Sequence, residues 1–101
     1  MFIAKVVRLR VEVSNSHALD RVLAHARDAF HDELGTLHWD VYDSGDDAER
    51  TLVEIFADGE AVRAHDESAA VATLLSELED LGVAIVAVDQ FARTSLIDKE
   101  Q

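Results

Sequence analysis

Residues 2–13 read FIAKVVRLRVEV, and their apolar side chains recur at alternate positions. Successive side chains of a β-strand point to opposite faces of a sheet, so this alternation predicts a strand. One face is strongly apolar and holds Ile3, Val7, Leu9, Val11 and Val13. The other face begins with Phe2, Ala4 and Val6 before it becomes charged. The first strand therefore offers apolar surface on both of its faces.

The segment after this strand has the three- and four-residue spacing of an amphipathic helix. Its apolar positions are Leu19, Val22, Leu23, Ala26 and Phe30. The run Ser14-Asn15-Ser16 supplies hydroxyl and amide side chains that can cap the first turn. Gly35 follows the last apolar position, so we expect the helix to end before it.

The period of two returns in residues 36–43, where Leu37, Trp39 and Val41 alternate with polar or aromatic neighbours. It continues in residues 50–57, which are apolar on both faces. The short polar sequence SGDD at residues 44–47 separates these two runs and has the composition of a turn. Together they predict a β-hairpin.

Two further helices and a last strand follow the hairpin. Asp58 can cap a short helix, and Ser68 can cap a longer one that Gly82 ends. Residues 83–91 form the last predicted strand, and residues 83–88 are apolar at both alternating sets of positions. A strand of this kind is typically buried on both faces.

The predicted order is strand, helix, strand, strand, helices, strand, which is the ferredoxin-like β-α-β-β-α-β arrangement. We therefore expect an α+β fold with a four-stranded antiparallel sheet and helices on one face. Residues 1–95 would form this single domain, and residues 96–101 would be a polar C-terminal tail. A chain of 101 residues has nothing left to cover the second sheet face, although that face carries apolar residues. We expect a homodimer that packs sheet against sheet.

Composition excludes several classes of function. The chain has 9 Lys and Arg against 21 Asp and Glu, a net charge of −12, so neither nucleic acid nor an anionic membrane is an expected partner. It has no cysteine, which excludes disulfides and thiol chemistry. No apolar run is long enough to span a bilayer, and no signal-peptide pattern occurs, so the expected location is cytoplasmic.

Residues 54–68 read EIFADGEAVRAHDES, and residues 33–41 read ELGTLHWDV. The first segment combines Glu54, Phe56, the acidic turn at Asp58, His65 and a following serine. This pattern resembles the antibiotic biosynthesis monooxygenase domain family, a branch of the dimeric α+β-barrel proteins. The resemblance implies that the expected homodimer is such a barrel.

The resemblance also implies a chemistry. Oxygenases of this family hold an aromatic or quinol-type substrate between sheet and helices, and the deprotonated substrate reacts directly with dioxygen. We therefore expect a cofactor-independent monooxygenase with no metal and a small hydrophobic aromatic ligand. His65 would be the catalytic residue, supported by Glu54. Val7, Trp39 and Phe56 would bind the substrate.

Two departures from the family pattern leave an alternative open. Phe56 stands where the family often has tryptophan, so an N–H donor is missing. Val7 stands where haem-degrading members have asparagine, which argues against haem degradation. The alternative is a non-catalytic dimeric module of the same fold that binds a small ligand or acts as an accessory protein. In that case His65 and Glu54 are structural, and Trp39 and Phe56 are core residues.

Overall fold

The computed structural model describes residues 1–93, so the predicted tail at 96–101 and the last two residues of the predicted domain lie outside the described residues. The elements follow the predicted order. They are β1 (Ile3–Arg10), the 3-10 helix η1 (Val13–Asn15), α1 (Ser16–His31), β2 (Thr36–Tyr42), β3 (Glu49–Phe56), α2 (Gly59–Asp66), α3 (Ala69–Asp80) and β4 (Ala84–Ala92).

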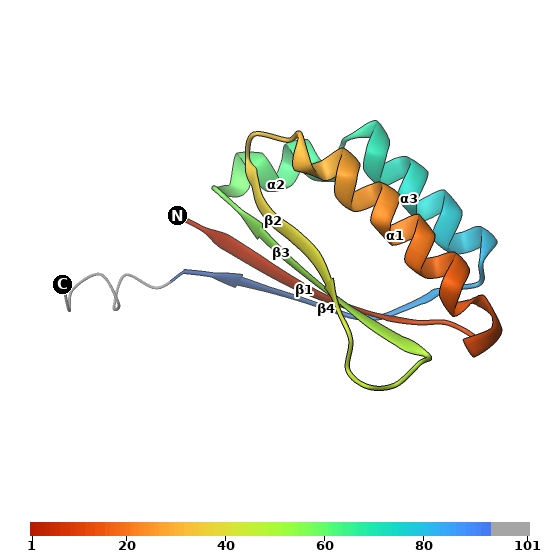
Figure 1. Ribbon diagram of the computed structural model, residues 1–101. Helices are drawn as coiled ribbons and strands as arrows, with labels where there is room; N and C mark the ends of the chain where they lie inside the picture. Colours follow the sequence, from red (N-terminus) through yellow and green to blue (C-terminus); the bar gives the residue numbers. More distant parts are fainter. Residues whose placement is uncertain (94–101) are drawn as a thin grey trace.

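The four strands form one sheet in the order β2-β3-β1-β4, and every neighbouring pair is antiparallel. All three α-helices lie on the same face of this sheet (Figure 1), and the opposite face is uncovered in the single chain. The predicted α+β, ferredoxin-like arrangement is confirmed. Each helix in residues 1–93 is too short or too polar to cross a membrane.

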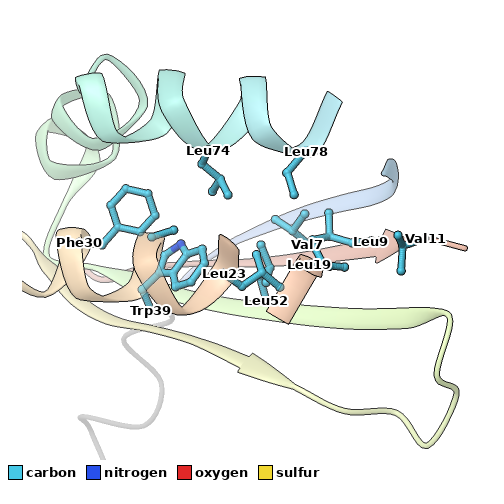
Figure 2. Close-up of a cluster of buried hydrophobic side chains, with 11 residues drawn as sticks. Val7, Leu9, Val11, Leu19, Leu23, Phe30, Trp39, Leu52, Leu74 and Leu78 are labelled. Carbon is cyan, nitrogen blue, oxygen red and sulfur yellow. The ribbon is translucent and has the colours of Figure 1, made fainter. Parts of the chain in front are cut away.

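The core fills the space between the helices and the sheet. Leu74 and Leu78 of α3 point toward Val7 and Leu9 of β1, as Figure 2 shows. The largest core side chains with no exposed surface are two phenylalanines, Phe30 near the end of α1 and Phe56 at the end of β3. Burial of apolar surface drives folding, so this layer holds the helices on the sheet.

Two predicted helix caps are confirmed, and one is not. The side chain of Asp58 accepts a hydrogen bond from the backbone of Ala61, and Ser68 accepts one from Val71. Asn15 precedes α1, but its side chain caps no backbone group of that helix. It donates instead to the carbonyl oxygen of Leu81 at 3.2 Å, which ties the start of α1 to the end of α3.

The prediction that the last strand is buried on both faces is wrong for the single chain. In β4, Ile85 is 47% exposed, Val88 is 58% exposed and Phe91 is 57% exposed. The strand lies at the edge of the sheet and pairs only with β1, so few of its neighbours shield it. The sequence pattern correctly predicts an apolar strand, but within the described residues of one chain the apolar side chains of β4 remain exposed.

Candidate functional site

A cavity of about 160 Å³ lies between the sheet and α3. Most of its lining is apolar, including Val7, Leu52, Leu74 and Val88. One part of the lining is polar and consists of Lys5, Glu54, His65 and Asp66. A mostly apolar hollow with a few polar groups is the usual composition of a small-molecule site.

His65 lies in the last turn of α2 and is only 5% exposed. Two aromatic rings hold its imidazole: the ring centre of Phe30 is 4.4 Å away and that of Phe56 is 5.0 Å away. Its Nδ1 atom lies 2.7 Å from Oε1 of Glu33, which is hydrogen-bond distance. Its Nε2 atom lies 3.7 Å from Oε1 of Glu54, which is too long for a hydrogen bond.

Glu33 contacts His65 from outside the cavity, and the sequence pattern does not predict this contact. It lies in the loop between α1 and β2, where Oε1 also accepts a hydrogen bond from the hydroxyl of Thr36 at 2.6 Å. A Cβ atom added at Gly35 would clash with Ala61 of α2, so only glycine allows this loop to lie so close to α2. No helical or strand spacing links position 33 to position 65, because tertiary packing alone brings them together.

Glu54 lies on β3 directly opposite Lys5 of β1, among apolar neighbours. Burial raises the pKa of its carboxyl group, and the nearby charges of His65 and Lys5 act in the opposite direction. Among the described residues, Glu54 makes neither a hydrogen bond with His65 nor an ion pair with an arginine of β1. The neighbouring cation is Lys5, whose Nζ atom also lies 3.3 Å from Asp66, while Arg10 pairs with Glu49.

The raised pKa of Glu54 predicts how stability depends on pH. The folded carboxyl group binds its proton more tightly than the unfolded one, so the folded state carries more protons just above the ordinary pKa of 4.5. The contribution of Glu54 to the free energy of unfolding should therefore fall as pH rises through this window. Glu54→Gln removes the buried charge, so it should raise the melting temperature at neutral pH and have little effect below the window.

Thermal unfolding followed by circular dichroism at acid and neutral pH checks this expectation. Glu67→Gln is the matched control, because Glu67 is exposed just after α2. This control substitution should leave the melting temperature unchanged at both pH values. A Glu54→Gln variant less stable than the wild type at neutral pH would contradict the expectation, because it would mean that attraction to His65 and Lys5 outweighs burial.

The structure brings most of the predicted site residues together. Val7, Trp39, Glu54 and His65 all line the cavity. Phe56 does not: it has no exposed surface, and its ring packs against His65. Lys5 and Asp66 also line the cavity, although sequence reasoning assigned them no role at the site.

Histidine and acidic side chains are common metal ligands in proteins. Within residues 1–93, no three histidine, cysteine or acidic side chains are placed to hold a metal ion together. Independence from metal and cofactor stays a prediction. The polar groups of the cavity can exchange a proton with a bound hydroxyl group, because an imidazole and a carboxyl group face the same space.

Comparison with known proteins adds information on the fold. No family model matches the chain, and no curated protein matches it. Solved structures do match. A "putative antibiotic biosynthesis monooxygenase" from Deinococcus radiodurans is 20% identical, with a TM-score of 0.83 over 93% of each chain.

Two further solved structures also resemble the chain. A protein from Nitrosomonas europaea with the same description is 18% identical, with a TM-score of 0.79 over 94% of this chain and 90% of its own. A protein from Bacteroides thetaiotaomicron, described as a "possible oxidoreductase", is 19% identical, with a TM-score of 0.82 over 89% of this chain and 95% of its own. Identities this low establish the fold and leave the activity open. The chain therefore has the fold of the antibiotic biosynthesis monooxygenase proteins, as the residues around Glu54 and His65 indicated.

Proposed function

We propose that the chain is a cofactor-independent monooxygenase acting on a small hydrophobic aromatic or quinol-type molecule. The observation that carries the proposal is the position of His65. His65 lines the polar part of an otherwise apolar cavity, and its Nε2 atom lies 3.7 Å from Glu54, which lines the same part. A substrate hydroxyl placed there would meet a base while its ring lies against apolar walls.

The size of the cavity limits the substrate. A volume of about 160 Å³ is below the roughly 300–1,000 Å³ of drug-sized sites and close to the ~150 Å³ of a cavity known to hold benzene. We therefore favour substrates of one or two rings. Leu75, Ile85 and Val88 line the cavity and are all about half exposed, so the ligand would enter between α3 and the edge strand β4.

The proposed reaction needs only substrate and dioxygen. His65 Nε2 takes the hydroxyl proton, and the electron-rich anion reduces dioxygen and forms a carbon–oxygen bond. The oxygen–oxygen bond then breaks, one oxygen atom stays on the ring as product and the other leaves as water. A naphthohydroquinone would give a hydroxynaphthoquinone and water in this way, with all atoms and electrons balanced. Lys5 is the cation that lines the cavity within residues 1–93, and it would lower the energy of the substrate anion.

We also propose that the active form is a homodimer packed sheet against sheet. The uncovered face carries apolar side chains from three strands, which strand register assigns to Ala4, Val6, Val53, Ile55 and Phe91. Contiguous apolar surface that spans several strands is typical of a protein–protein contact. A second copy of the chain is the occupant that fits, because a twofold axis brings the same apolar strip onto itself and buries Phe91 of β4, whereas Ile85 and Val88 stay on the cavity side.

Oxygen uptake by chelator-treated protein tests the proposed activity, with naphthohydroquinone as probe and isotope-labelled dioxygen. We expect one labelled oxygen atom in the product and a rate above that of spontaneous oxidation. His65→Ala should lower the rate by roughly 10²-fold or more, because it removes the base. His17→Ala, at an exposed position of α1, is the matched control and should leave the rate unchanged.

The same assay separates the two candidate functions. Hydrogen peroxide without labelled product would mean plain oxidation of the probe and would overturn the monooxygenase proposal. A rise in melting temperature on adding the probe, with no oxygen uptake above background, would support the ligand-binding module instead. An unchanged rate in His65→Ala would remove His65 from the mechanism.

A further inference from the structure

Glu33 makes the shortest polar contact with the proposed base, although it does not line the cavity. We infer that Glu33 is a positioning residue that keeps the proton of neutral His65 on Nδ1, so that Nε2 faces the cavity as a free base. The chemical use of this arrangement rests on the proposed function. The arrangement itself is a property of the folded protein and can be measured without any reaction.

Hydrogen-bond chemistry gives the direction of the contact. An ionised carboxylate only accepts hydrogen bonds, and Oε1 of Glu33 lies 2.7 Å from His65 Nδ1. Thr36 donates its hydroxyl proton to the same oxygen atom at 2.6 Å. Two donors therefore converge on one acceptor. The opposite tautomer would place the lone pair of Nδ1 against this oxygen, so two acceptors would face each other at hydrogen-bond distance.

Nε2, the other ring nitrogen of His65, is left available to accept a hydrogen bond from a ligand. The nearest charged partner of Nε2 is Glu54, and 3.7 Å is too long for a hydrogen bond. Lys5 and Asp66 also line this part of the cavity, but they pair with each other at 3.3 Å. The rings of Phe30 and Phe56 pack against the imidazole and present no hydrogen-bond acceptor of comparable strength. A hydroxyl group of a ligand could therefore donate to Nε2 with little competition from the protein.

The backbone keeps Glu33 in place. The backbone amide of Ala57 donates to the carbonyl oxygen of Gly35 at 2.9 Å, and Gly35 packs directly on Ala61 of α2. His65 lies on that same helix. The loop that carries Glu33 and the helix that carries His65 are thus in direct contact, which gives the 2.7 Å contact a rigid support.

Nitrogen-15 NMR of the imidazole side chains tests the inference on the neutral form of the ring. His65→Gln identifies the His65 signals among the five histidines. We expect the wild-type proton on Nδ1. Glu33→Ala should shift most of the population to the Nε2–H form, because the acceptor is gone. Glu33→Gln should restore the Nδ1–H form, because its amide oxygen can accept the same hydrogen bond.

Glu60→Ala is the matched control, since it removes a surface carboxylate that pairs only with Arg63 among the contacts of the described residues. It should leave the His65 tautomer unchanged. A wild-type proton on Nε2, or an unchanged tautomer in Glu33→Ala, would overturn the inference. The NMR measurement does not depend on oxygen uptake. A failed activity assay would therefore contradict the proposed function without affecting the result on the tautomer.

Discussion

Replacing Phe30 by alanine is expected to lower the free energy of unfolding by about 3–5 kcal/mol. Phe30 has no exposed surface, and its ring lies 4.9 Å from that of Trp39 and 4.4 Å from that of His65. Its loss would leave a cavity at the junction of α1, the sheet and α2, which neighbouring side chains can fill only in part. Because small domains are stable by roughly 5–15 kcal/mol, this one change would remove a large share of the total.

Urea unfolding followed by circular dichroism and by Trp39 fluorescence measures this loss. Leu34→Ala is the control, because Leu34 is 99% exposed and lies only a few residues away. A surface change of this kind should stay within about 0.5 kcal/mol of the wild type. The free energy of unfolding of Phe30→Leu should lie between those of Phe30→Ala and Leu34→Ala. A Phe30→Ala variant within about 1 kcal/mol of the wild type would contradict the assignment of Phe30 to the centre of the core.

Val53→Asp is expected to convert the proposed dimer into monomers. Val53 lies on β3, opposite Val6 and Asp40 on its neighbouring strands, and these positions share the uncovered face of the sheet. In a sheet-to-sheet dimer the change would bury an unpaired carboxylate in each of two copies. Each such burial costs about 2–5 kcal/mol, so the dissociation constant should rise by at least ~10³-fold.

Light scattering at micromolar concentration should report a mass of about twice 11.1 kDa for the wild type and 11.1 kDa for Val53→Asp. Ser76→Asp adds the same charge at an exposed position of α3 and should leave the dimer intact. Circular dichroism should show that both variants are folded. A wild-type protein that is a monomer under these conditions would refute the dimer, and so would a Val53→Asp variant of unchanged mass.

Much of the candidate site could be predicted from sequence because its members lie on regular elements. The alternation of the first strand places Val7 on the core face, and the hairpin pattern does the same for Trp39. A carboxylate among apolar strand residues marked Glu54 as unusual. Phe56 was predicted to bind the substrate but does not line the cavity. Its place on the strand follows from the alternation, but the packing of its ring against His65 depends on where α2 lies.

The order of the elements, the caps at Asp58 and Ser68 and the apolar inner face of the sheet were determined by the sequence alone. Each of these follows from residues a few positions apart, so local backbone geometry is enough to predict them. Tertiary structure alone decided that Glu33 meets His65, that Lys5 lies beside Asp66 and that β4 stays exposed in one chain. Those contacts join residues more than thirty positions apart, or depend on what lies outside the chain. No periodic pattern encodes such distances, because they are set by how whole helices and loops pack on the sheet.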